Sequence, residues 1–214
     1  MLYPFVANQW NNHRQKQLIS SYEDNLTQMT EAGDIDYAKE LKKAQAYNDA
    51  LVPSILPDSF AVADAREEED STYMNCLNLT GDGMMGIVEI PKIAIKLPIY
   101  HGTSDEVLQQ AAGHLEGSSL PIGGESTHAV ISAHRGLPSA SLFTDLDQLE
   151  AGDTFQITVL DRVLVYEVTQ TEVVLPEELN GLVAESDKDQ VTLVTCTPYG
   201  VNSHRLLIHG ERVQ

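Results

Sequence analysis

The sequence predicts a mostly β protein: a closed barrel of seven to eight strands with short helices, preceded by an N-terminal α-helical hairpin. From Met84 onward, runs of β-branched and aromatic residues recur about every ten residues and are separated by turn signals. Many short strands with only brief helical inserts are typical of a closed or nearly closed barrel. Before residue 52, apolar side chains recur instead at helical spacing.

The N-terminal part predicts two amphipathic helices. The first, from about residue 8 to 30, has one apolar stripe and is broken by Gly33. This stripe consists of Leu18, Tyr22, Leu26 and Met29. Asp34 can cap the second helix, and Pro53 ends it. The second stripe consists of Tyr37, Leu41, Ala44, Asn48 and Leu51. Such helices must bury their stripes against another surface.

Three regions follow from this pattern: a helical extension over residues 1–51, a connecting segment over 52–82 and a barrel domain over 83–214. The predicted strands cover residues 86–90, 93–99, 128–133, 154–160, 163–174, 191–196 and 205–210. A short helix over 105–112, capped by Ser104, separates the second and third strands. Pro91 and Pro98 belong at strand ends or at a sheet edge.

Composition limits the partners of this chain. Its 214 residues, 42% of them apolar, suffice for one good core. With 13 basic and 32 acidic residues the net charge is -19, which argues against binding to nucleic acid and disfavours docking on anionic lipid. No apolar stretch of about 20 residues is present, so the chain as given predicts a soluble protein.

Three reactive side chains stand near predicted strand ends. Cys196 ends the most β-prone run, and Arg205 lies nine residues later in the neighbouring strand. His134 ends a third strand and is followed by the turn glycine Gly136. An isolated thiol, with a pKa near 8.5, is only a few per cent thiolate at pH 7, so a nucleophilic cysteine needs such neighbours. An imidazolium favours the thiolate, and an arginine can hold an oxyanion.

Each of these residues also has a structural interpretation. A strand cysteine is often a buried hydrophobe, and a lone histidine or arginine is often a packing or ion-pair residue. The remaining histidines of strand-like or turn context are interpreted as structural: His101, His128, His204 and His209. No histidine or cysteine spacing is typical of a metal site, so neither metal nor cofactor is predicted. Cys76 and Cys196 are expected to be free thiols, because a disulfide would block the nucleophile.

The motifs resemble those of a known family. The segment 192–198, the segment 202–207 and the upstream Ala-His-Arg-Gly over 133–136 are similar to the signature of the sortases, Gram-positive cysteine transpeptidases, and most similar to the pilus-assembling class C. The resemblance implies that Cys196 is the nucleophile, His134 its acid/base partner and Arg205 an oxyanion or substrate clamp. It further implies cleavage of an LPXTG-like sorting signal between Thr and Gly, and transfer of the acyl group to a pilin lysine.

Residues 52–82 correspond, in class C sortases, to a lid over the active site that is anchored by an Asp-Pro-aromatic tripeptide. The nearest match here is Asp58-Ser59-Phe60. Serine in place of proline frees one φ angle and predicts a looser lid. If the Asp58–Arg205 pair were exposed it would contribute about 0 to 1 kcal/mol, so removing the anchor predicts only a few-fold gain in thiol reactivity. The loop over 175–189, with a helical turn at 176–179, is expected to line the peptide groove.

The resemblance also implies location. Class C sortases usually carry a hydrophobic span at each end, and this sequence is interpreted as an ectodomain trimmed of such anchors, from the extracytoplasmic face of a Gram-positive membrane. The expected partners are pilin subunits with C-terminal sorting signals. A wall-anchoring sortase, a cysteine hydrolase of the same fold and a noncatalytic surface module stay open as alternatives.

Overall fold

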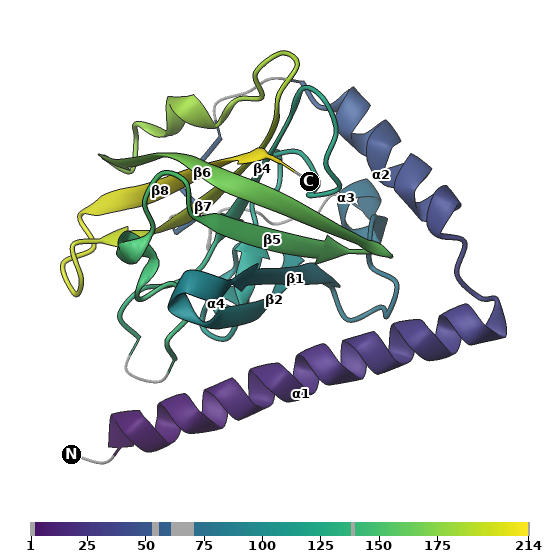
Figure 1. Cartoon of the computed structure of the whole chain (residues 1–214), viewed down its shortest axis with the longest axis horizontal. Coiled ribbons are helices and arrows are strands. Elements are labelled where there is room, and N and C mark those ends of the chain that lie inside the picture. Colours follow the sequence, from purple (N-terminus) through teal and green to yellow (C-terminus); the bar gives the residue numbers. More distant parts are fainter. Residues whose placement is uncertain (1–2, 53–55, 61–70, 138–139, 214) are drawn as a thin grey trace.

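The computed structural model describes residues 3–52, 56–60, 71–137 and 140–213 (Figure 1). Eight strands form a closed barrel in the order β1-β2-β3-β4-β7-β8-β6-β5, which confirms the predicted fold class. The strands are β1 Met84–Ile90, β2 Ile95–His101, β3 Ala112–His114, β4 Thr127–Ser132, β5 Thr154–Val159, β6 Arg162–Val174, β7 Asp189–Thr197 and β8 His204–Arg212. The pairs β2–β3 and β4–β7 are parallel, and the other pairs are antiparallel.

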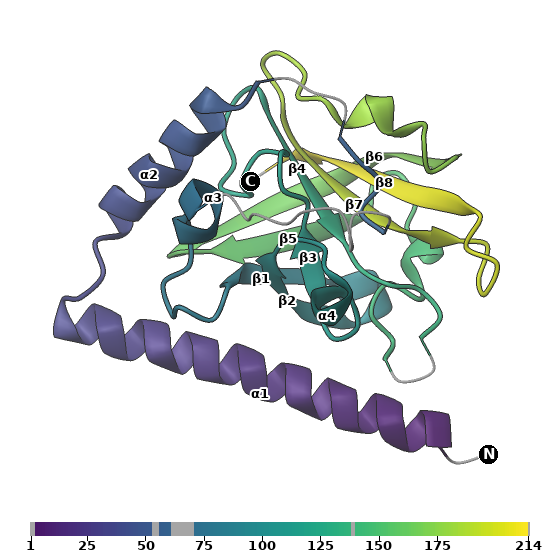
Figure 2. The ribbon, with the colours of Figure 1, turned by 180° about the vertical axis from the view of Figure 1, so that it is seen from behind.

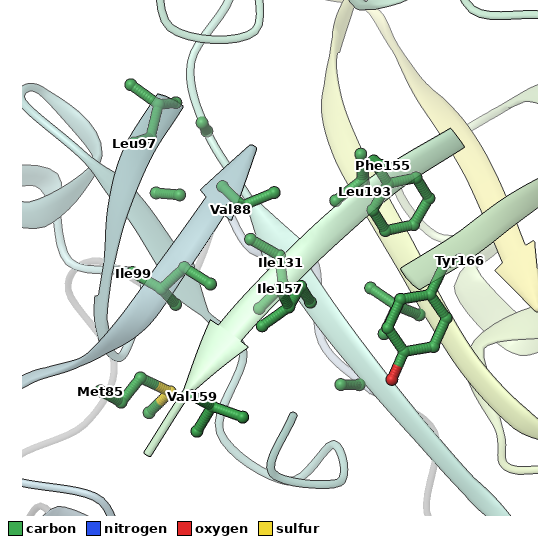
Figure 3. Close-up of a cluster of buried hydrophobic side chains, with 14 of the residues drawn as sticks. Met85, Val88, Leu97, Ile99, Ile131, Phe155, Ile157, Val159, Tyr166 and Leu193 are labelled. Carbon is green, nitrogen blue, oxygen red and sulfur yellow. The ribbon is translucent and has the colours of Figure 1, made fainter. Parts of the chain in front are cut away.

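Alternate residues of these strands fill the barrel. Figure 3 shows Ile131, Ile157 and Leu193 pointing into one cluster, with the rings of Phe155 and Tyr166 stacked at its side. Full burial of each large apolar side chain stabilises the fold by roughly 1.5 to 3 kcal/mol. The strand alternation then directs the intervening residues to the outer face of the barrel.

One strand escaped the prediction. The expected helix over 105–112 ends early, at Leu108 in α4 (Asp105–Leu108), and Ala112–His114 instead form β3. Small apolar residues after a helix read locally as its continuation, whereas the pairing of β3 with β2 and β4 is decided by distant segments. Gly113 permits that pairing, because a Cβ there would lie 2.3 Å from the Gly102 carbonyl oxygen. The predicted cap by Ser104, whose side chain accepts from the Val107 amide, is confirmed.

The two N-terminal helices are α1 (Tyr3–Ala32) and α2 (Tyr37–Ala50). Asp36, rather than Asp34, caps α2 by accepting a hydrogen bond from the Lys39 amide. Asp34 is already used at the end of α1, where its amide donates to the Met29 carbonyl after Gly33 turns the chain at a φ of +76°. The prediction of Asp34 as the cap was therefore wrong by two residues.

The helices cover two different sides of the barrel (Figures 1 and 2). Tyr22 and Leu26 of α1 pack with Met84 and Ile87 of β1, whereas Ala44 of α2 belongs to the main core. Each helix thus buries its own stripe against the barrel rather than against the other helix.

Short elements complete the frame: α3 (Ser71–Asn75), η2 (Pro91–Ile93), η3 (Leu146–Gln148) and η4 (Leu179–Leu182). The predicted turn at 176–179 begins three residues before η4 and overlaps it at Leu179. Pro91 begins η2, and Pro98 pairs with Ile87 of β1 just before β3 joins the other edge of β2. Both prolines therefore stand at a strand end or edge, as predicted. The division of the chain into three regions stays a prediction.

Candidate active site

Cys196 and Arg205 are direct neighbours across two strands. Cys196 is the second-last residue of β7, Arg205 is the second residue of β8, and their Cα atoms are partners in the antiparallel register. The side chains of such a pair leave the sheet on the same face. Leu193 and Leu206 of these strands belong to the barrel interior, so Cys196 and Arg205 face outward.

His134 is brought level with Cys196 by the parallel pairing of β4 with β7. That register ends at Ser132 beside Val194, and Ala133 continues it by donating its amide to the Val194 carbonyl at 3.1 Å. The Thr195 hydroxyl returns a 2.7 Å hydrogen bond to the Ala133 carbonyl. The predicted thiol, imidazole and guanidinium therefore share one end of the barrel.

The turn after His134 is held by its surroundings. Gly136 has a φ of +78°, and a Cβ there would lie 3.1 Å from the Tyr199 ring on the β7–β8 loop. Arg135 donates to the Thr197 hydroxyl at 3.2 Å and pairs with Asp147 at 2.5 Å. The strand ends that carry His134 and Cys196 are thus tied to each other beside the reactive groups.

Asp58 and Phe60 lie directly on this site. The Arg205 Nε and Nη2 atoms donate to the two Asp58 carboxylate oxygens at 2.8 and 2.6 Å. The Phe60 ring lies next to both Arg205 and His134: its centroid is 5.1 Å from the Arg205 Cζ atom and 5.3 Å from the His134 ring centroid. The tripeptide thus occupies the approach to the guanidinium and the imidazole.

The Asp58–Arg205 pair is not the exposed pair that the sequence suggested. The two side chains are only 9% and 8% exposed. Charge-assisted, two-pronged pairs of this kind are the strong class of hydrogen bond, and removing one partner of a buried pair is costly. The exposure assumed for this pair was therefore wrong, because burial depends on residues far away in the sequence, and the strength of the anchor stays a prediction.

Two residues of this segment make contacts that the sequence did not predict. Ser59, only 1% exposed, accepts a 2.7 Å hydrogen bond from the Ser132 hydroxyl of β4, so the residue that replaces proline fastens the segment to the barrel. Leu56 lies in a buried apolar cluster on the outer face, with Phe60 packed against it. The other buried members of this cluster are Leu115, Val130, Leu179, Leu182, Val194 and Leu207. Serine and leucine in a loop carry no signal of such contacts.

The covered site favours uncharged reactive groups. Burial raises the pKa of the Cys196 thiol; Arg205 opposes this effect, and Asp58 adds to it. Burial also lowers the pKa of His134, against a smaller opposing effect of Asp105. At neutral pH the resting pair is consequently a thiol and a neutral imidazole.

The four histidines interpreted as structural, His101, His128, His204 and His209, make hydrogen bonds. His101 bonds the carbonyl oxygens of Gly83 and Cys76 at 2.8 Å through its two ring nitrogens. Both cysteines are buried, and neither forms a disulfide. Within the part of the chain that the structure describes, no three histidine, cysteine or acidic side chains are grouped as metal ligands would be. No helix among the described residues has an apolar stretch long enough to cross a bilayer.

A closed barrel that gathers a thiol, an imidazole and a guanidinium at one end is the arrangement of the barrel-shaped cysteine transpeptidases. Residues 88–213, more than half of the chain, match the family described as the sortase domain. The chain therefore belongs to the sortase family.

Related proteins and structures agree with this assignment. Sortase D of Bacillus subtilis is 32% identical over 131 residues, which cover 60% of this chain and 63%, less than two thirds, of that protein. The structure of sortase C from Streptococcus pneumoniae is 43% identical, with a TM-score of 0.82 and coverage of 92% of this chain and 97% of that chain. Sortase C1 of Streptococcus agalactiae is 46% identical, with a TM-score of 0.79 and coverage of 92% and 98%. A sortase C of Group B Streptococcus, described as pilus-related, is 43% identical, with a TM-score of 0.76 and coverage of 83% and 89%.

Proposed function

We propose that this protein is a pilin-polymerising cysteine transpeptidase. The observation that carries the proposal is the meeting of Cys196, His134 and Arg205 at one end of a sortase barrel. The similarity to sortase C structures, one of them described as pilus-related, favours pilins as the substrates. Each substrate would present a C-terminal LPXTG-like sorting signal.

In the first half-reaction, His134 takes the proton of the Cys196 thiol, and the resulting thiolate attacks the carbonyl carbon of the threonine in the signal. The negative charge moves to the carbonyl oxygen, where Arg205 donates hydrogen bonds. As the tetrahedral intermediate collapses, the bond to glycine breaks and protonated His134 gives its proton to the leaving amine. The product is a thioester between the pilin threonine and Cys196, together with a free glycine amine.

In the second half-reaction, the ε-amine of a lysine on the next pilin attacks the thioester carbonyl. His134, now neutral, accepts a proton from that amine, and the Cys196 thiolate leaves as the isopeptide bond forms. Acid–base assistance of this kind supplies on the order of 10² to 10⁴ in rate. Water in place of the amine would make the same enzyme a hydrolase.

Asp58 and Phe60 serve, in this proposal, as a lid that keeps the resting enzyme inactive. Their contacts hold Arg205 and cover His134, so a sorting signal has to displace them before it reaches Cys196. Leu56 belongs to the same apolar cluster as Val194, which lies two residues along β7 from the nucleophile. The lid therefore occupies the surface that an extended peptide would need.

The location proposed is the extracytoplasmic face of a Gram-positive cell membrane, where sortases meet their exported substrates. Residues 1–51, 52–82 and 83–214 would then form a helical extension, a lid segment and the catalytic barrel.

The deciding experiment is incubation with a fluorogenic LPXTG peptide, with and without an amine acceptor. Product that requires the amine supports a transpeptidase, amine-independent cleavage supports a hydrolase, and no cleavage supports a noncatalytic module. The Asp58→Ala variant is assayed in parallel, because a closed lid would also prevent cleavage. His134→Ala and Arg205→Ala should each lower turnover by orders of magnitude; full activity in either would refute the assigned roles.

A further inference from the structure

A chain of hydrogen bonds crosses the neighbouring strands β4, β7, β8 and β6 on the outer face of the barrel. The His128 Nε2 atom of β4 lies 2.7 Å from the Thr192 hydroxyl of β7, which lies 2.9 Å from the His209 Nδ1 atom of β8. The His209 Nε2 atom lies 3.1 Å from a carboxylate oxygen of Glu172 on β6. At the other end, the His128 Nδ1 atom lies 3.3 Å from the Val183 carbonyl oxygen in the β6–β7 loop. We call this set of residues the polar relay.

The middle of the relay is buried, whereas Glu172 and Val183 at its two ends are partly exposed. His128 is 3% exposed and Thr192 is fully buried. A buried polar atom without a hydrogen bond is costly, which requires that each contact be supplied with a hydrogen where possible. The protonation of the relay can therefore be worked out by counting hydrogens.

Four contacts need four hydrogens. The Val183 carbonyl and the Glu172 carboxylate only accept, while two neutral histidines and one hydroxyl supply three hydrogens. All four contacts form only when one histidine is an imidazolium. Burial lowers the pKa of His128 to about 4, and Glu185, paired with Lys188, is the other charged group that faces it. The extra proton therefore belongs on His209, next to the Glu172 carboxylate.

With His209 protonated, every hydrogen bond has one direction. His209 donates to Glu172 and to the Thr192 oxygen, Thr192 donates to the His128 Nε2 atom, and the His128 Nδ1–H donates to the Val183 carbonyl. Without that proton, the hydrogen bond to the charged carboxylate is the stronger of the two open to His209, so its ring donates to Glu172 and accepts at Nδ1. Thr192 then donates to His209, His128 donates through Nε2, and its bare Nδ1 faces the carbonyl oxygen.

We propose that the polar relay is a positioning device that couples the protonation of His209 to the attachment of the β6–β7 loop. In the protonated state Val183 is fastened to β4, and in the neutral state that fastening is lost. Its role in turnover rests on the proposed function. Leu179 and Leu182 of the loop belong to the apolar cluster around Leu56, and Leu182, Val183 and His128 also line a cavity of about 240 Å³ beside Leu56.

Leu179 and Leu182 of the loop pack close to the site, so we expect peptide binding to be the step that changes. Thr192 lies four residues from Cys196 along β7, roughly 13 Å at the rise of a strand, which is too far to touch the reacting bond. Loss of the fastening should therefore raise KM for the sorting peptide and leave the chemical step to Cys196 and His134. A rise of roughly threefold to tenfold corresponds to one net hydrogen bond.

The first test does not depend on activity. Long-range proton–nitrogen NMR of the full chain reads the tautomer of each histidine ring across about pH 5 to 8, the range in which histidine ordinarily changes charge. We expect His128 to carry its proton on Nδ1 at the acidic end and on Nε2 at the basic end, with the change of tautomer accompanying the loss of the His209 proton. A single His128 tautomer across the range would overturn the relay.

The second test is the pH dependence of KM. Glu172→Gln removes the counter-charge of His209 and should shift the rise in KM to lower pH, whereas Glu167→Gln, the same change at an exposed position of β6, should follow the wild type. Thr192→Val should abolish the contribution of the relay to the pH dependence of KM. If this variant fails to fold, the comparison of Glu172→Gln with Glu167→Gln decides. Identical KM profiles for wild type and Glu172→Gln would refute the link to turnover. Absence of turnover in both the wild type and Asp58→Ala at every pH would instead refute the proposed function, and the NMR test would still decide the relay.

Discussion

Replacing Asp58 with alanine tests how firmly the lid is held. The carboxylate accepts two hydrogen bonds from Arg205, at 2.8 and 2.6 Å, and both side chains are about nine-tenths buried. A hydrogen bond to a charged group contributes about 1.5 to 3 kcal/mol, and 1.36 kcal/mol is one factor of ten. Loss of one such contribution would raise the fraction of uncovered enzyme roughly 10- to 150-fold.

The electrostatic effect has the same sign. Burial is the main cause that raises the pKa of the Cys196 thiol, and Asp58 adds to it while Arg205 opposes it. Removing the Asp58 carboxylate lowers that pKa, so the thiolate fraction at pH 7 increases. We therefore expect Asp58→Ala to react with a small alkylating reagent at least tenfold faster than the wild type, and its pH profile to move to lower pH.

The assay follows single-site alkylation of the folded protein by mass spectrometry, in a Cys76→Ser background that leaves Cys196 as the only thiol. Asp147→Ala is the matched control, because it removes another carboxylate paired with an arginine near the site without touching the lid. Phe60→Ala should also accelerate alkylation. Equal rates in wild type, Asp58→Ala and Phe60→Ala would show that these residues do not cover the thiol.

Three further predictions concern the thiols, the turn after the histidine and a buried histidine. Cys196→Ala should abolish turnover with nearly unchanged thermal unfolding, whereas Cys76→Ser should stay active; the reverse result would assign the wrong thiol. Gly136→Ala should cost about 1 to 3 kcal/mol in the free energy of unfolding and lower turnover, and Gly200→Ala, with a similar φ of +73° but open space, separates backbone strain from the Tyr199 contact. Burial lowers the pKa of His114 from 6.5 to about 4, so the unfolded chain binds more protons between these values; stability present above pH 6.5 should fall by on the order of 3 kcal/mol by pH 4. The free energy of unfolding, measured with urea across that range, should depend less steeply on pH in His114→Gln. An unchanged dependence on pH would contradict this reasoning.

Periodic patterns predicted the fold well where one face of an element is buried. Tyr22 and Leu26 lie on the buried stripe of α1, and the alternation of β7 places Leu193 inside the barrel. Three-residue β3 has too few residues to show a period. Its existence depends on pairing with β2 and β4, which a local pattern does not encode.

The sequence by itself determined which segments form most of the strands and placed Cys196 and Arg205 near two facing strand ends, because side-chain alternation and turn signals are local properties. Only the tertiary structure decided the electrostatics of the site. Asp58 and Arg205 are 147 residues apart, and the burial of the pair, which strengthens the interaction of its charges by lowering the dielectric constant around them, depends on contacts between distant segments. The same holds for the polar relay, whose hydrogen count appears only when the register aligns His128, Thr192, His209 and Glu172 across four strands. Distances and dielectric surroundings set these energies, and both arise from contacts between distant segments.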